Sequence, residues 1–273
     1  MKKTFEILYI MPFIEEVTEP LELKAIEDVK QFYYSQNIEK SRTFHQYCNT
    51  LPDKMKTVVD LIKYGKIMHE IFAYYPGQTV DAINGMNEIY VSSIGAAGSD
   101  RVFETPHLDG PFFFLPFCTV LRTVLAIQGN RDIATDFPAV HARHSLETNE
   151  FLVFDYNRDV HFISKFENTQ NNVDRILLKL HYIVTPSFVP FSVVQLYSAL
   201  HSKYNSLMRT IFLYSQKNGE RENYYQCSLT KERLPIIIYI IILECIMRYC
   251  LSFCYGNLCI FFYFKRRLFI KGI

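Results

Sequence analysis

The stretch Thr105-Pro106-His107-Leu108-Asp109-Gly110-Pro111-Phe112 lies near the middle of the 273-residue chain and decides how the rest is interpreted. His107 and Asp109 are two residues apart, and side chains at that spacing point to the same side of an extended segment. An imidazole and a carboxylate on one side are two of the ligands that a metal ion of intermediate hardness takes. Two ligands are too few, so the chain must supply a third from elsewhere.

Length and composition are those of an ordinary globular protein. The chain can enclose one sizeable core, with 49% hydrophobic and 21% charged residues. A formal net charge of +1 excludes the strongly basic surface that is typical of nucleic-acid-binding proteins. None of the seven cysteines forms a Cys-x-x-Cys pair, so free thiols in a reducing, intracellular compartment are expected.

The first part of the chain, residues 1–85, predicts a helical N-terminal cap. Glu19-Pro20 is a plausible helix start, and hydrophobic residues then recur at every third or fourth position. Thr50-Leu51-Pro52-Asp53 opens a second helix, which Tyr75-Pro76-Gly77 ends. These helices are expected to pack against a core and to carry no chemistry.

From about residue 86 the pattern changes to short β-rich segments separated by turns. Turns are predicted at 129–132 and 157–159, between strands at 88–95, 112–117, 120–127, 150–156, 160–163 and 175–184. Short strands at such intervals favour a barrel or sandwich core over residues 86–190. A C-terminal helical region is expected over 191–232.

The best candidate for the third metal ligand is His161. It lies 54 residues after His107, directly behind the predicted turn at 157–159, and opens a strand. Two histidines and one carboxylate on one side of a metal leave three positions open, which is the pattern of non-heme Fe(II) oxygenases. Open positions are what oxygen activation requires, because a co-substrate and O₂ must both reach the iron.

Arg175 adds a cation to this group. It lies 14 residues after His161 in a hydrophobic strand, where a charged residue requires an anionic partner. A guanidinium binds a carboxylate through two parallel hydrogen bonds, which suits the distal carboxylate of a dicarboxylic co-substrate. Lys179 lies on the same face and is the reserve candidate, and His181, also on that face, is interpreted as pocket wall or core.

The order His-x-Asp, then a histidine at a strand start, then an arginine resembles the Fe(II)/2-oxoglutarate-dependent dioxygenase superfamily over about residues 86–190. The resemblance implies an α+β chain with a double-stranded β-helix (jelly-roll) core. It implies that His107, Asp109 and His161 bind Fe(II), and that Arg175 binds the C5 carboxylate of 2-oxoglutarate, with Tyr90 also contacting this co-substrate. The implied activity is hydroxylation of an unidentified substrate with O₂, with release of succinate and CO₂.

The chain departs from the family pattern in two places, so the subfamily and the substrate stay open. Asn149-Glu150 replaces the usual small residue and glycine before the second motif, and no Asn-x-Ser lies near Arg175. One alternative is a cupin-type metal-binding or non-enzymatic β-barrel module. Another is a membrane-associated protein in which the His-x-Asp is accidental. His141 and His144 form a rival metal pair, for which a solvated loop is the preferred interpretation.

The end of the chain, residues 233–273, is a hydrophobic tail. Its segment Leu234–Phe264 is long enough to cross about 30 Å of hydrocarbon, and Lys265-Arg266-Arg267 would mark the cytoplasmic side. Three interpretations stay open: a C-terminal membrane anchor, a buried helix pair of the domain, and a segment produced by a shifted reading frame. The first of these would tether an intracellular protein to a membrane.

Overall fold

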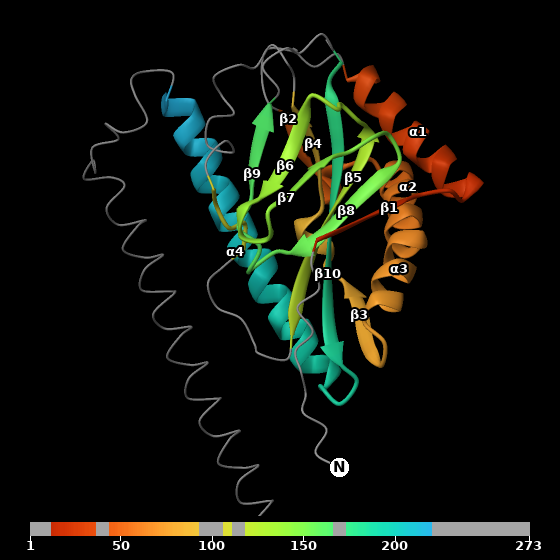
Figure 1. Cartoon of the computed structure of the whole chain (residues 1–273), viewed down its shortest axis with the longest axis vertical. Coiled ribbons are helices and arrows are strands. Elements are labelled where there is room, and N and C mark those ends of the chain that lie inside the picture. The colour runs from red at the N-terminus through yellow and green to blue at the C-terminus, as the bar shows by residue number, and fades with distance from the viewer. Residues whose placement is uncertain (1–11, 37–43, 93–105, 111–117, 166–172, 220–273) are drawn as a thin grey trace, which may run out of the picture. The chain divides into compact units, whose positions relative to one another are not determined.

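The computed structural model describes residues 12–36, 44–92, 106–110, 118–165 and 173–219. Over these residues the chain forms antiparallel sheets and a few helices (Figure 1), so the predicted α+β class is confirmed. Residues Met1–Tyr214 form one unit and Ser215–Ile273 another. All the described strands and all the described helices but the last lie entirely within the first unit.

The larger sheet takes strands from both halves of the chain. Within the described residues its order is β1-β8-β5-β10-β4-β2, and β3 pairs with the far half of β10. All of these pairings are antiparallel. The strands are β1 (Phe13–Glu16), β2 (Phe44–Tyr47), β3 (Gln78–Ala82), β4 (Glu88–Ser92), β5 (Thr119–Gln128), β8 (Glu150–Asp155) and β10 (Arg175–Pro186).

Strand β10 serves the two faces of this sheet differently. Ile176, Leu178 and Leu180 belong to the main hydrophobic core, which also contains residues of the three N-terminal helices. Arg175 and Lys179, on the opposite face, line a pocket. Because successive side chains of a strand point to opposite faces, one strand can contribute to the core and to the site at once.

The smaller sheet closes the other side of this pocket. It consists of β7 (Ala142–Ser145), β6 (Ile133–Phe137) and β9 (Phe162–Lys165), in the order β7-β6-β9. Just before β9, His161 forms an isolated antiparallel pairing with His107. Thr135 and Ile163 of the smaller sheet line the pocket together with Tyr90, Val124 and Leu177 of the larger one, so the pocket lies between the two sheets.

The predicted N-terminal helices are α1 (Pro20–Ser35), α2 (Asp53–Tyr64) and α3 (Lys66–Tyr74). The second predicted helix is broken in two at Gly65, because both carboxylate oxygens of Glu22 accept the backbone N–H of Lys66, at 3.0 and 3.1 Å. A Cβ at position 65 would lie 2.5 Å from this carboxyl group. The Glu22 side chain of α1 therefore starts α3, as an acidic group at a helix N-terminus does.

The region predicted as a helical cap also contains strands. β1, β2 and β3 fall within residues 1–85 and pair with β8, β4 and β10 of the larger sheet. The cap and the β core therefore share one sheet in the described part of the chain. The turns predicted at 129–132 and 157–159 are confirmed, since they separate β5 from β6 and β8 from β9.

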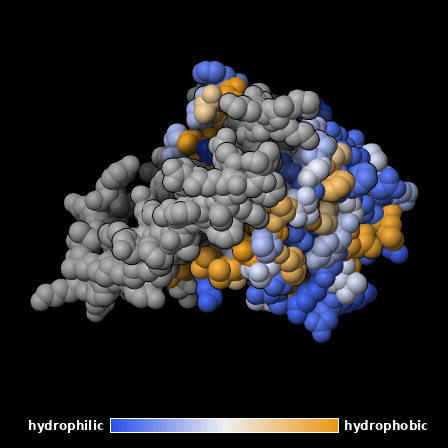
Figure 2. All heavy atoms as spheres, turned by 90° about the horizontal axis from the view of Figure 1, so that it is seen from below, coloured by the Kyte–Doolittle hydropathy of each residue, from blue (hydrophilic) through white to orange (hydrophobic). Residues whose placement is uncertain are grey.

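The helix expected after residue 190 is present as α4 (Phe191–Gly219). It is hydrogen-bonded to the larger sheet: the side-chain amide of Asn205 donates to the hydroxyl of Tyr47 in β2 at 3.3 Å. None of the helices in the described ranges is both long and hydrophobic enough to cross a membrane. On the face seen in Figure 2, hydrophobic side chains lie interspersed with hydrophilic ones. The predicted hydrophobic tail, residues 233–273, lies outside the described residues.

Candidate metal centre

His107 and His161 are brought together by their backbones. The N–H of each donates to the carbonyl of the other, at 2.9 and 3.0 Å. The Nδ1 of His161 also lies 3.0 Å from the backbone carbonyl of Asp159, which holds the hydrogen on Nδ1. The Nε2 atom of His161 is therefore free to act as a ligand, and a carbonyl-bonded imidazole is the usual form of a metal-binding histidine.

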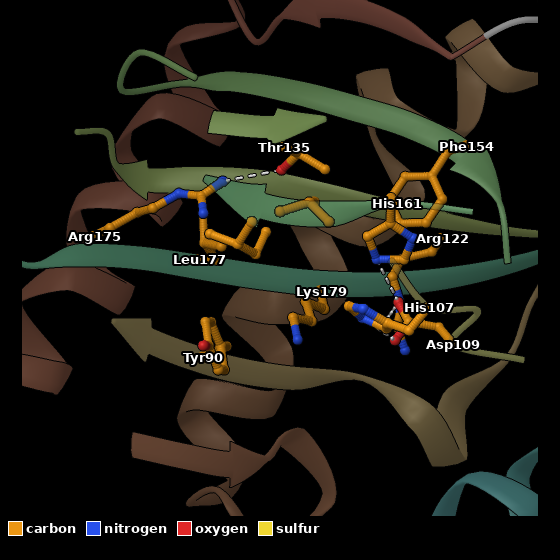
Figure 3. Close-up of a pocket in the computed structure, with 12 residues that line it drawn as sticks. Tyr90, His107, Asp109, Arg122, Thr135, Phe154, His161, Arg175, Leu177 and Lys179 are labelled. Carbon is orange, nitrogen blue, oxygen red and sulfur yellow. Dashed lines mark hydrogen bonds and ion pairs between the residues drawn. The ribbon is translucent and has the colours of Figure 1, made fainter. Parts of the chain in front are cut away.

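Asp109 completes a group of three potential ligands. Its Oδ2 lies 3.2 Å from Nε2 of His161, and its Oδ1 lies 3.7 Å from Nε2 of His107. One ligand atom from each of the three residues falls within 4.8 Å of the others. Figure 3 shows the three side chains gathered at one end of the pocket. The structure thus brings the predicted triad together, and two imidazoles with one carboxylate form a donor set suited to Fe(II).

Gly110 fixes the segment that carries His107 and Asp109. Its backbone N–H donates to the carbonyl of Tyr156 at 2.9 Å. A Cβ at this position would lie 2.7 Å from the same carbonyl oxygen and 2.6 Å from the Tyr156 ring. The backbone approach that aligns Asp109 with His161 therefore requires a residue without a side chain.

Sequence reasoning missed Arg122 of β5. Its Nη1 donates to Oδ2 of Asp109, and its Nε donates to Nε2 of His181 at 2.9 Å. Burial raises the pKa of Asp109, but the Arg122 guanidinium and the neighbouring His161 outweigh burial and hold that pKa well below its usual range. The available signal was a single charge within the hydrophobic strand segment Thr119–Gln128, where a buried charge requires a partner.

Arg175 lies at the other end of the pocket from the triad (Figure 3). Its side chain is among the largest that are fully buried, and Nη2 makes a weak contact, 3.5 Å from Oγ1 of Thr135. Its Nε and Nη1 have no hydrogen-bond partner within the described part of the chain. Burial lowers the pKa of Arg175 to about 10, so the group stays charged at neutral pH. A buried cation with spare donors fits an anionic ligand in this pocket.

Lys179, the reserve candidate, is already engaged. Its Nζ lies 3.2 Å from Oε1 of Glu88 and 4.1 Å from the centre of the Tyr90 ring. Burial lowers the pKa of Lys179, and the charge of Glu88 opposes this shift. Tyr90 lines the pocket as predicted, and its contact with a co-substrate stays a prediction.

The remaining histidines take other places. His181 is fully buried and serves as the acceptor for Arg122. His144 lies in β7, so the predicted solvated loop is wrong there, while His141 occupies the exposed turn before it with a φ of 52°. Neither belongs to the group of potential ligands found among the described residues.

No protein-family model matches the chain, and no curated protein matches it. Several solved structures do resemble it, at low identity. The 2OG complex of the viral collagen prolyl hydroxylase vCPH from Paramecium Bursaria Chlorella virus-1 is 11% identical, with a TM-score of 0.43, over 63% of this chain and 96% of that one. The non-heme alpha ketoglutarate dependent carbocyclase SnoK from nogalamycin biosynthesis is 9% identical, with a TM-score of 0.44, over 63% and 79%.

A third match is HygX from Streptomyces hygroscopicus with nickel and 2-oxoglutarate bound. It is 8% identical, with a TM-score of 0.39, over 65% of this chain and 83% of that one. All three are described with 2-oxoglutarate or alpha-ketoglutarate. This is the co-substrate that the sequence resemblance implies. The likeness is distant in both sequence and structure.

Proposed function

We propose that this protein is an Fe(II)/2-oxoglutarate-dependent oxygenase that hydroxylates a substrate and releases succinate and CO₂. One observation carries the proposal. A potential metal triad lines the same pocket as a fully buried arginine, two of whose donor atoms have no hydrogen-bond partner among the described residues. A metal centre alone would not require a buried guanidinium, whereas a co-substrate that joins a metal-binding end to a distal carboxylate requires both groups.

The strand order supports a double-stranded β-helix as the fold of the core. Between β4 and β10 the chain passes from the larger sheet to the His107 segment, back to β5, and then to β6 and β7 of the smaller sheet. It returns to the larger sheet at β8, crosses to β9 and ends in β10. Each sheet thus receives strands from along the whole core, which is how a jelly roll places a site between two sheets.

Each side chain has a defined role in this proposal. His107, Asp109 and His161 would hold Fe(II), to which 2-oxoglutarate and O₂ would need access. The iron supplies the oxidising chemistry when it is bound. Arg175 binds the C5 carboxylate, with Thr135 orienting its guanidinium from the side.

The pocket wall between the two ends is largely hydrophobic. Val124, Phe154 and Leu177 line it, together with the Lys179 side chain that Glu88 holds. A hydrophobic wall that excludes water strengthens the electrostatic attraction between Arg175 and a carboxylate, because water then screens this attraction less. The site therefore favours a dicarboxylic 2-oxo acid over one that lacks the distal carboxylate.

Ligand discrimination tests this proposal. The metal-loaded protein, with Mn(II) in place of Fe(II), is titrated calorimetrically with 2-oxoglutarate and with 2-oxobutyrate, which lacks the distal carboxylate. Wild type should bind 2-oxoglutarate with an affinity at least about 30-fold higher than that for 2-oxobutyrate, which is the effect of one buried charge pair. Arg175→Met should bind both acids with the same low affinity, and Arg175→Lys should recover part of the preference.

Arg143→Gln is the matched control, because Arg143 is half-exposed and its Nε donates to Asp136 away from the pocket. This variant should keep the wild-type preference. Equal binding of both acids by wild type would remove the co-substrate role and leave the metal-binding module as the better interpretation.

A further inference from the structure

Arg122 makes a contact with the metal centre that the proposed function does not yet use. Its Nη1 donates to Oδ2 of Asp109, one of the three potential metal ligands. We propose that Arg122 is a positioning residue that occupies one oxygen of Asp109, so that this carboxylate binds the metal through a single atom. The inference rests on the proposed function, since it concerns the same metal centre.

Three contacts hold the guanidinium of Arg122 in one orientation. Besides Asp109, it donates from Nε to Nε2 of His181 at 2.9 Å, and its central carbon lies 4.6 Å from the centre of the Tyr156 ring. The Tyr156 hydroxyl in turn donates to Oδ1 of Asn205 in α4 at 3.2 Å. A guanidinium held on three sides cannot turn away from Asp109 without breaking these contacts.

His181 is suited to be an acceptor rather than a second cation. It is fully buried, and it faces Arg122 directly across the β5–β10 pairing. Accepting from Arg122 at Nε2 requires the neutral ring with its hydrogen on Nδ1. The positive charge of the pair therefore stays on Arg122, beside Asp109.

The number of oxygens that Asp109 offers decides how many positions the metal keeps. With one oxygen bound, two histidines and Asp109 fill three of six positions and leave three. If both oxygens bound, only two positions would remain, and the keto-acid end of 2-oxoglutarate would take them both. By holding Oδ2, Arg122 would leave a position open for O₂ on the bound metal.

The test counts the water molecules on the bound metal and uses no 2-oxoglutarate. Full-length wild type, Arg122→Met and Arg122→Lys are loaded with Mn(II), and the water-proton relaxation per bound ion is measured at matched occupancy. Arg122→Met should relax water at about two-thirds of the wild-type rate, because two open positions replace three. Its Mn(II) affinity should stay within about threefold of wild type, because Asp109 then binds through two atoms. Arg122→Lys keeps one N–H donor near Asp109 and should recover most of the wild-type rate.

Arg131→Gln is the control, because the Arg131–Glu147 pair is exposed and lies outside the pocket. It should match wild type in affinity and in relaxation. If Arg122→Met relaxes water at the wild-type rate, the proposal is wrong. It is also wrong if this variant no longer binds Mn(II), because Arg122 would then be needed for the fold of the site.

If Arg122→Met does not fold, the proposal is tested with His181→Leu instead, because this substitution removes the acceptor that holds Nε of Arg122. A lower relaxation rate in that variant supports the proposal, and an unchanged rate overturns it. Failure of wild type to bind Mn(II) at all would refute the metal centre itself, which separates failure of the proposed function from failure of the role of Arg122.

Discussion

Asp155 is a buried acidic residue whose side chain holds the turn before His161. Its Oδ1 accepts the backbone N–H groups of Asn157 and Arg158, at 2.9 and 3.1 Å. Burial raises the pKa of Asp155 to about 6, although these two hydrogen bonds lower it. The folded protein therefore holds a proton on this carboxyl more tightly than the unfolded chain does, where the pKa is about 4.

The sign of the resulting pH dependence follows from that difference. The stability that protonated Asp155 contributes is fully present below about pH 4 and is lost as the pH rises through about 6, to a total of roughly 3 kcal/mol. Asp155→Asn keeps a neutral acceptor at every pH and should remove this loss. Urea denaturation of both proteins at pH 4 and pH 7.5 measures it, and parallel changes in the two proteins would contradict the assignment.

Gly110 is predicted to tolerate no side chain. In Gly110→Ala the new Cβ must displace the Tyr156 backbone carbonyl and the Tyr156 ring, because both lie closer than a carbon atom can approach. We expect a loss of roughly 2 kcal/mol in the free energy of unfolding, together with weaker metal binding through Asp109. Gly77→Ala is the control for stability alone, since a Cβ there meets nothing within 4 Å and only its φ of 78° is unfavourable.

The two buried arginines show which site residues a sequence can predict. Arg175 can be predicted because it follows three metal-ligand candidates, His107, Asp109 and His161, at a spacing that resembles a known family. Arg122 stands equally isolated in a hydrophobic strand, but no sequence spacing indicates that it pairs with Asp109, 13 residues earlier. A charged residue in a buried strand indicates that some partner must be present. The sequence does not say which residue that partner is, because this depends on how the strands pair.

Among the elements, the predictions held where a segment carries its own signal. β10 was predicted from a hydrophobic run with a charge at its start, and α1 from a proline at its first turn. β2, with the sequence Phe-His-Gln-Tyr, carries no alternation and exists because β4 pairs with it. The break between α2 and α3 at Gly65 likewise depends on Glu22, more than 40 residues earlier.

The start of α3 can be tested through that side chain. Glu22→Gln keeps one acceptor oxygen but removes the negative charge from the helix N-terminus, so we expect a loss of roughly 1 kcal/mol in the free energy of unfolding. Chemical denaturation at neutral pH measures this loss. Glu27→Gln, at an exposed position of the same helix, should change stability by less than about 0.5 kcal/mol. Equal effects of the two substitutions would contradict the role of Glu22.

At the scale of the whole described unit, Glu88 joins elements that are far apart in the sequence. Its carboxylate lies 3.2 Å from Nζ of Lys179 in β10, 3.1 Å from Nη1 of Arg209 in α4 and 3.3 Å from Nδ1 of His45 in β2. Its side chain is only 9% exposed. The carboxylate of Glu88 thus links β2 and α4 to β10, the strand that carries Arg175.

Removing that charge should affect the whole unit. Glu88→Gln leaves the largely buried cations Lys179 and Arg209 without this anion, and we expect a loss of roughly 3 kcal/mol in the free energy of unfolding. Asp53→Asn, which breaks the exposed pair with Lys56, is the control and should cost less than about 1 kcal/mol. A small effect of Glu88→Gln would show that the charge of Glu88 does not hold these elements together.

The most direct test of the central claim is anaerobic absorption spectroscopy of the metal-free protein with Fe(II) and 2-oxoglutarate. Wild type should develop a weak visible charge-transfer band only when both are present, because the co-substrate then binds iron held by His107, Asp109 and His161. His161→Ala should lose the band, and Arg175→Met should need a much higher concentration of 2-oxoglutarate to produce it. Absence of the band in wild type, or an unchanged band in His161→Ala, would contradict the account.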